Sequence, residues 1–159
     1  MTEPKSVTSR DNPLLQRLRK LVRDPGAYRR LGAVWLEGEH LGAALGARGG
    51  RPAQAVISES ARAQPGLAAL AATAASVVVV PDRLFGELSA LPSPAGIGFV
   101  IELPSAGPLD PQAPTVVLDR LQDAGNVGSI LRSASALGVR QVLALSGTAA
   151  LWSPKVLRA

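Results

Sequence analysis

The sequence predicts an α/β fold, with a small three-layer α/β domain followed by the beginning of a second α/β domain. Strand-prone runs alternate with helix-prone runs along most of the 159 residues, as expected for helices layered on a sheet. Hydrophobic residues make up 47% of the chain, which is enough for a packed core. Four prolines between positions 103 and 115 interrupt the alternation and predict a linker at 104–114.

The first predicted element is an amphipathic helix over residues 13–23. Asn12 can cap its free N–H groups, and Pro13 loses no hydrogen bond at the first helical position. Asp24-Pro25-Gly26 ends the helix. Apolar residues recur at helical spacing on one side, and basic residues occupy much of the rest; the apolar set is Leu14, Leu18, Leu21 and Val22.

Later elements follow from alternating composition. In the first domain we expect strands at 34–37, 54–58, 76–80 and 96–103 and helices at 39–47 and 61–75, with a short helix capped by Asp82 reaching Ala90. The second domain is expected to contain strands at 115–118 and 140–145, a helix at 126–137 and a helix opening at Ser153-Pro154. These make about 45 residues, near the size below which a domain seldom folds unaided, so we expect this domain to be incomplete.

Positive charge is concentrated near the N-terminus. The net charge is +5 and the pI about 10.7. Between positions 5 and 30 only Asp11 and Asp24 oppose eight basic residues, which are Lys5, Arg10, Arg17, Arg19, Lys20, Arg23, Arg29 and Arg30. Such clustering is typical of a binder of the nucleic-acid backbone, although a solvated basic helix is also possible.

Other residue types exclude several classes of site. The absence of cysteine excludes disulfides and thiolate metal ligands, and the single His40 cannot build a metal cluster or an acid–base triad. Asp119 and Asp123 have no third carboxylate close by, so no metal site is expected. No apolar run is long enough to cross a membrane, and we expect a cytoplasmic chain.

Residues 118–134 combine a strand, a glycine-bearing turn and a helix start. Gly125 and Gly128 would let backbone approach a ligand, and the helix start favours anions. Asn126 and Arg132 are less than two turns apart, so we expect them on one side, where they would suit a phosphate-ribose unit. An ordinary turn with a capping Asn and a surface Arg explains the pattern equally well. The glycine spacing fits neither the dinucleotide fingerprint nor the P-loop.

The same segment, residues 123–134 followed by Gly138, resembles the first signature motif of the SpoU/TrmH family of RNA 2′-O-ribose methyltransferases, part of the SPOUT superfamily. Further segments are similar to other parts of this family, in the right order along nearly the whole chain. They are residues 8–13 in the lead-in, 34–41 and 93–97 in the substrate-binding domain, and 153–159 at the start of the next catalytic-domain helix.

The resemblance implies an RNA substrate-binding domain at 1–103 and an incomplete SPOUT domain at 115–159, the domain that forms a trefoil knot. It implies S-adenosylmethionine as methyl donor, a homodimer, ribosomal RNA as substrate, and Asn126 and Arg132 as catalytic residues. The family's second and third motifs are absent, so the cofactor-binding residues are expected beyond Ala159 and this chain alone is expected to be inactive. The residues expected to bind RNA are Arg10, Asn12, Arg17, Arg19, Lys20, Arg23, Arg29 and Arg30.

Two other functions remain open. A non-catalytic RNA-binding module fits a chain that stops before the knot. A nucleotide-binding regulatory domain is also conceivable, but the basic N-terminus and the glycine spacing disfavour it.

Overall fold

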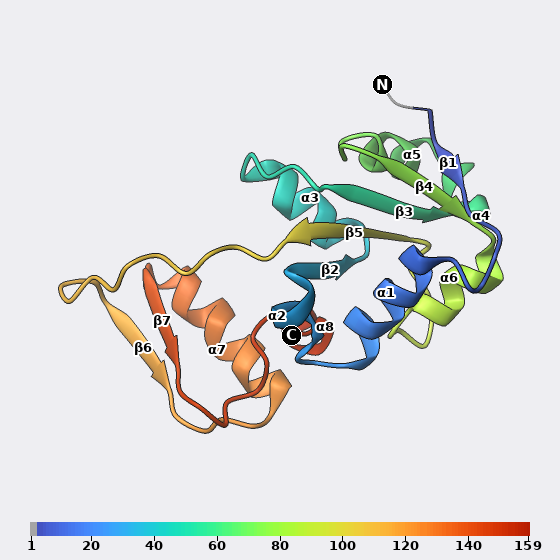
Figure 1. Cartoon of the computed structure of the whole chain (residues 1–159). Helices are drawn as coiled ribbons and strands as arrows, with labels where there is room; N and C mark the ends of the chain where they lie inside the picture. Colours follow the sequence, from blue (N-terminus) through green and yellow to red (C-terminus); the bar gives the residue numbers. More distant parts are fainter. Residues whose placement is uncertain (1–2) are drawn as a thin grey trace. The chain divides into compact units, whose positions relative to one another are not determined.

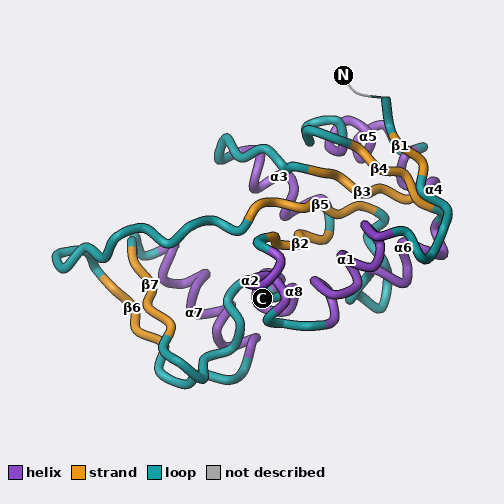
Figure 2. The backbone as a smooth tube through the Cα atoms, viewed as in Figure 1, coloured by secondary structure: helices purple, strands orange, loops and turns teal. Residues whose placement is uncertain are grey.

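The computed structural model describes residues 3–159, and it divides into two compact units between Leu103 and Pro104. The α/β class expected from the sequence is confirmed. Figures 1 and 2 show a sheet with helices in the first unit and a shorter strand–helix–strand arrangement in the second. No helix within the described range is both long and apolar enough to cross a bilayer.

The first unit is built on a five-stranded mixed sheet with the order β1-β4-β3-β5-β2. β1 pairs in parallel with β4 and β4 with β3, whereas β5 is antiparallel to both β3 and β2. The strands are β1 Lys5–Ser6, β2 Ala33–Glu37, β3 Gln54–Ser58, β4 Val77–Val80 and β5 Ile97–Glu102.

Helices cover both faces of this sheet and give the expected three layers. The helices are α1 Pro13–Arg23, α2 Ala27–Leu31, α3 Glu39–Ala47, α4 Glu59–Arg62, α5 Pro65–Ala71 and α6 Asp82–Leu88. On one face Trp35 of β2 lies 6.4 Å from Phe85 of α6, measured between ring centroids, and α1 packs beside α6. On the other face α3 packs against Phe99 of β5. Every residue of β2 is buried, because both sides of the strand are covered.

Two details differ from the sequence prediction in the first unit. The single helix expected at 61–75 is wrong: α4 and α5 are separate, because Pro65 holds Gln64 in an extended conformation and can only begin a new helix. The capping role expected for Asp82 is also wrong. Pro81 occupies the capping position, and the Asp82 carboxylate instead accepts a hydrogen bond from the Ser60 hydroxyl. β1 and α2 were not predicted.

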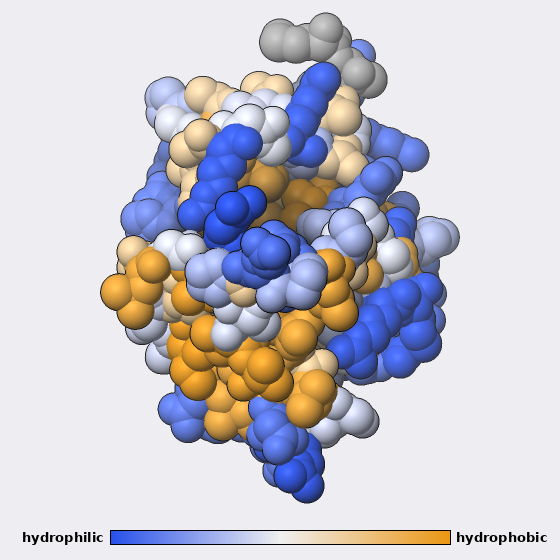
Figure 3. All heavy atoms as spheres, turned by 90° about the vertical axis from the view of Figure 1, so that its left-hand side faces the viewer, coloured by the Kyte–Doolittle hydropathy of each residue, from blue (hydrophilic) through white to orange (hydrophobic). Residues whose placement is uncertain are grey.

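The second unit contains β6 Thr115–Leu118, α7 Ala124–Ala136, β7 Gln141–Ala144 and α8 Pro154–Arg158. β6 and β7 pair in parallel from Thr115↔Gln141 to Leu118↔Ala144. One face of this pair packs on the helices around a small core of Leu118, Val127 and Val156. Apolar side chains also gather on the surface of this unit (Figure 3), where Val117 is 54% and Leu137 83% exposed.

Candidate catalytic helix and nucleic-acid interface

The candidate catalytic helix α7 begins after the strand β6 and the loop that follows it. Asp123 caps it, since its carboxylate accepts a hydrogen bond of 2.7 Å from the Asn126 backbone N–H. Asn126 is therefore inside the first turn, and the helix starts two residues before the predicted position. Its side chain is exposed, and no residue within 3–159 forms a hydrogen bond with the side-chain amide.

Gly128 serves the packing of two helices, a role that the sequence interpretation missed. A Cβ atom at this position would lie 2.5 Å from the Ala159 Cβ and 2.6 Å from the Val156 carbonyl oxygen. Gly128 is buried, and the absence of a side chain lets α8 approach the backbone of α7 closely. The missing side chain of Gly128 therefore makes room for α8, and not for a ligand.

Arg132 lies further along α7 and is exposed. Its guanidinium donates a hydrogen bond to the main-chain oxygen of Ala159, at the end of α8. The expectation that Arg132 and Asn126 share one side of the helix is wrong in its geometry. Six residues at about 100° each leave the two side chains roughly 120° apart around the axis. A ligand that contacts both must curve around the helix.

The loops that follow β6 and β7 meet at the same edge of the parallel pair, near the start of α7. The Thr148 hydroxyl donates to the Leu118 carbonyl oxygen over 2.9 Å, and the Ala149 N–H donates to the Leu121 carbonyl oxygen over 2.8 Å. Arg120 adopts a left-handed backbone conformation with φ of 51° and pairs with Asp119. The carbonyl oxygens of Leu118 and Leu121 and the N–H of Ala149 are therefore already bonded within the protein.

The basic helix α1 forms as predicted. The Asn12 side chain accepts a hydrogen bond of 2.9 Å from the Leu14 N–H, so its amide has a capping role. Leu15, Leu18 and Leu21 are the buried residues, so the apolar stripe is shifted by one position at its start relative to the predicted set. The rest of the helix surface carries the charges.

The cations predicted to bind RNA differ in their exposure and in the number of hydrogen bonds and ion pairs that they form within the protein. Arg19 is the most engaged: its side chain is 14% exposed and donates to Glu87 and to the Arg10 carbonyl oxygen. Arg17 donates to the Leu31 carbonyl oxygen but is exposed. Lys20 and Arg23 are exposed, and their charged groups have no polar partner within the part of the chain that the structure describes.

The remaining two predicted cations follow α1. Arg30 pairs with Asp24, and this hydrogen bond is the main cause that lowers the pKa of the Asp24 carboxyl below its ordinary value. Asp24 therefore stays ionised at neutral pH and offsets the charge of Arg30. Arg29 lies over the Tyr28 ring, 5.3 Å from its centroid, and its guanidinium is exposed.

Two acidic residues that the sequence interpretation did not assign organise this surface. Glu87 of α6 binds Arg10 and Arg19, which joins the N-terminal segment to α1 and α6. Glu37, only 6% exposed, accepts hydrogen bonds from the Ser89 hydroxyl and the Ala90 N–H and so anchors the chain after α6. The spacing of Arg83 and Glu87, four residues apart, was the available sequence signal for the first of these.

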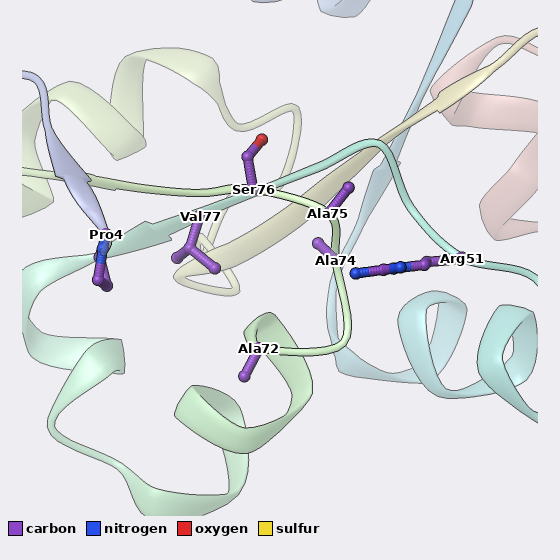
Figure 4. A pocket seen from close by; sticks show the side chains of 7 residues that line it. All are labelled: Pro4, Arg51, Ala72, Ala74, Ala75, Ser76 and Val77. Atoms are coloured by element: carbon purple, nitrogen blue, oxygen red, sulfur yellow. The ribbon is translucent and has the colours of Figure 1, made fainter. Parts of the chain in front are cut away.

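A pocket of about 250 Å³ lies at the edge of the first unit, beside the start of β4 (Figure 4). Arg51 is the one charged residue among those that line it, and the other walls are Pro4 and the small side chains of residues 72 and 74–77. One guanidinium and the Ser76 hydroxyl are the polar side-chain groups of this pocket, and they are too few to indicate a particular class of ligand.

Comparison with known proteins agrees with this geometry. Residues 113–159 match the model of the SpoU rRNA methylase family. A tRNA/rRNA methyltransferase of Synechocystis, itself uncharacterised, is 32% identical over 157 residues, which are 96% of this chain and 57% of that protein.

Two solved structures share the fold. An AdoMet-bound rRNA methyltransferase from Sinorhizobium meliloti has a TM-score of 0.79 at 24% identity, over 99% of this chain and 60% of the other. An RNA 2′-O ribose methyltransferase has a TM-score of 0.71 at 28% identity, over 96% of this chain and 60% of the other. The chain thus spans less than two thirds of the length of these relatives. Residues 113–159, which include α7, thus carry the SpoU methylase family segment, and both units share the fold of solved RNA methyltransferases.

Proposed function

We propose that this chain is the RNA-binding part and the first catalytic segment of an S-adenosylmethionine-dependent methyltransferase that acts on the ribose 2′-oxygen of ribosomal RNA. The observation that carries the proposal is α7: it bears Asn126 and Arg132 in the segment that matches the family model, directly after a parallel strand. The similarity to an RNA 2′-O ribose methyltransferase supports the choice of the ribose oxygen.

In this proposal Arg132 holds the target phosphate. A guanidinium presents several N–H donors in a fixed fork that matches phosphate oxygens. It is a poor base because its pKa lies above 12, so its contribution is electrostatic orientation of the RNA and not proton removal. Arg132 must exchange the Ala159 oxygen for the phosphate, and its exposure makes this exchange easy.

Asn126 is proposed to orient the ribose. Its side-chain amide is exposed and carries both a donor and an acceptor that no other described residue uses. Asp123 fixes the backbone of Asn126 at the start of the helix, so the side chain begins from a defined position. The two residues lie on different sides of α7, which suits a nucleotide whose ribose and phosphate follow the curve of the helix.

S-Adenosylmethionine would supply an electrophilic methyl group on a sulfonium. The backbone groups of Leu118, Leu121 and Ala149 at the strand ends are bonded within the protein, so they are not available to bind the donor. We therefore place the donor contacts, and the proposed homodimer contacts, in the region of the longer relatives that this chain does not span. It follows that the 159-residue chain alone binds RNA but does not transfer methyl groups.

A non-catalytic RNA-binding module is the second candidate, favoured by the exposed Lys20 and Arg23, whose charged groups have no polar partner among residues 3–159. The test joins the chain to the C-terminal region of the Synechocystis relative and measures transfer of tritium-labelled methyl from S-adenosylmethionine to ribosomal RNA. We expect transfer by the fusion and none by the 159-residue chain, with the modified nucleotide resistant to alkaline cleavage at its 3′ phosphodiester.

Variants of the fusion separate the roles. Arg132→Ala should abolish transfer and leave donor binding intact by calorimetry, whereas Arg140→Ala, an exposed arginine of the same unit, should keep both. Equal activity of the Arg132→Ala fusion would refute the assigned role. A fusion that binds RNA and the donor without methylating ribose would favour the binding module.

A further inference from the structure

Three arginines from different segments surround the carboxylate of Glu87. The Arg10 Nε lies 2.9 Å and the Arg19 Nη2 3.1 Å from the same oxygen, Oε2. The Arg83 Nη1 lies 4.0 Å from the other oxygen, Oε1. The cluster joins the segment before α1, α1 itself and α6, and three cations against one anion leave a positive surplus.

The members of this cluster are buried to different extents. The Glu87 and Arg19 side chains are 22% and 14% exposed, whereas those of Arg10 and Arg83 are 64% and 79% exposed. The carboxylate is thus sheltered, and the two outer guanidinium groups face solvent. An anion that approaches this surface meets Arg10 and Arg83 first.

Both outer arginines keep free donors. Arg10 uses its Nε–H for Glu87, which leaves its terminal N–H groups available. Arg83 is at ion-pair distance and forms no hydrogen bond with another described residue. Exposed ion pairs contribute only about 0–1 kcal/mol, so Glu87 competes weakly with an incoming phosphate. Through its hydrogen bond with Arg10, Glu87 reduces the conformational freedom of that side chain, which binding would otherwise have to remove.

The acidic residue next to Arg83 in sequence is engaged by another helix. Asp82 precedes Arg83, but its carboxylate is turned to Ser60, whose hydroxyl and backbone N–H both donate to it. Those hydrogen bonds, with that of the Ser60 hydroxyl the largest cause, lower the pKa of Asp82. Asp82 is therefore charged, and its carboxylate is engaged by Ser60 of α4.

We propose that Arg10 and Arg83 form a phosphate-binding subsite for the RNA backbone, with Glu87 and Arg19 as positioning residues beneath it. The proposal rests on the RNA-binding function proposed above and extends the RNA footprint from α1 onto α6. Arginine binds phosphate through paired N–H groups more specifically than a point charge does. Arg83 lies far in sequence from the basic N-terminal segment, and only the fold brings it to Arg10.

The test uses the 159-residue chain and a fluorescein-labelled RNA hairpin, with anisotropy titrations at several salt concentrations. Arg83→Gln should weaken binding and reduce the slope of log affinity against log salt by about 0.7–0.9, the value for one phosphate contact. Adding Arg10→Gln should roughly double this reduction. Arg83→Lys keeps the charge, so it should keep the slope and lose affinity because the fork is gone. Arg48→Gln, an exposed arginine at the end of α3, is the matched control and should leave both unchanged.

The outcomes separate the two proposals. Absence of RNA binding by the wild-type chain would overturn the RNA-binding function itself. Binding by the wild type with equal slopes for Arg83→Gln and Arg48→Gln would overturn the subsite alone. Thermal melting followed by circular dichroism is the second measurement. An unchanged midpoint with a reduced slope supports the subsite, and a fall in midpoint that accounts for the loss of binding refutes it.

Discussion

Two glycines of the helix α3, Gly42 and Gly46, differ in the space that surrounds them. Gly42 is buried against β5, and a Cβ atom there would lie 2.2 Å from Phe99 Cε2 and within 2.9 Å of two further atoms of that ring. Gly46 lies one turn later, is exposed, and has no atom within 4 Å of the corresponding position. We predict that Gly42→Ala destabilises the protein and Gly46→Ala stabilises it.

The magnitudes follow from two opposing effects. Alanine is favoured over glycine inside a helix by about 0.8–1.0 kcal/mol, and this gain is available at both positions. At Gly42 the new methyl group must displace Phe99, which is fully buried, and overpacking of this kind costs about 1–3 kcal/mol or more. The difference in unfolding free energy between the two variants isolates the packing cost, because the helix propensity cancels. We expect that difference to be about 1–3 kcal/mol.

Urea unfolding followed by circular dichroism measures this difference, with thermal melting as a check at roughly 4–8 °C per kcal/mol. Gly46→Ala is the internal control for helix propensity. Equal free energies of unfolding for the two variants would show that α3 does not approach β5 as closely as the structure has it.

Three further predictions concern the basic surface and the chain between the units. Replacing Lys20 or Arg23 by Gln should lower the slope of log RNA affinity against log salt concentration by about 0.7–0.9 for each residue, because both are exposed and lack a polar partner among residues 3–159. Unchanged slopes would contradict their contact with phosphates. Asn12→Ala should lower the free energy of unfolding by about 1 kcal/mol, because the helix cap is lost. Urea unfolding measures this loss, and an RNA titration should show no equivalent change in the salt dependence of binding. Limited proteolysis should cut first within residues 104–114 and leave a stable fragment ending near Leu103, whereas early cuts at 34–103 would count against this boundary.

Local sequence determined the elements whose signals lie within a few residues. α1, with Asn12 and Pro13 at its start, has the predicted bounds, as do α3, β3 and β6. Caps, proline and the apolar period act over one or two turns, so these elements can be predicted without knowing their neighbours. A local signal also existed for the break between α4 and α5, because Pro65 begins a new helix. The long alanine-rich run nevertheless led to the prediction of one continuous helix.

The family motif on α7 was also readable locally, because its residues are contiguous. The sequence predicted a helix with Asn126 and Arg132 on it, and the structure has that helix. The side on which each residue lies depends on the helix rotation, and the partners of Gly128 and Arg132 come from α8, about thirty positions later. Contacts at that separation depend on how α8 packs, which no local pattern specifies.

The roles of the basic residues were decided by tertiary structure alone. The sequence established that cations gather before position 31, and it treated Arg19 and Lys20 alike. In the fold Arg19 is held by Glu87, sixty-eight positions away, and Lys20 remains open to solvent. Arg83 joins Arg10 only because α6 packs beside α1. Charge is a property of each residue, but the availability of that charge depends on which carboxylates and carbonyl groups the packed chain places beside it.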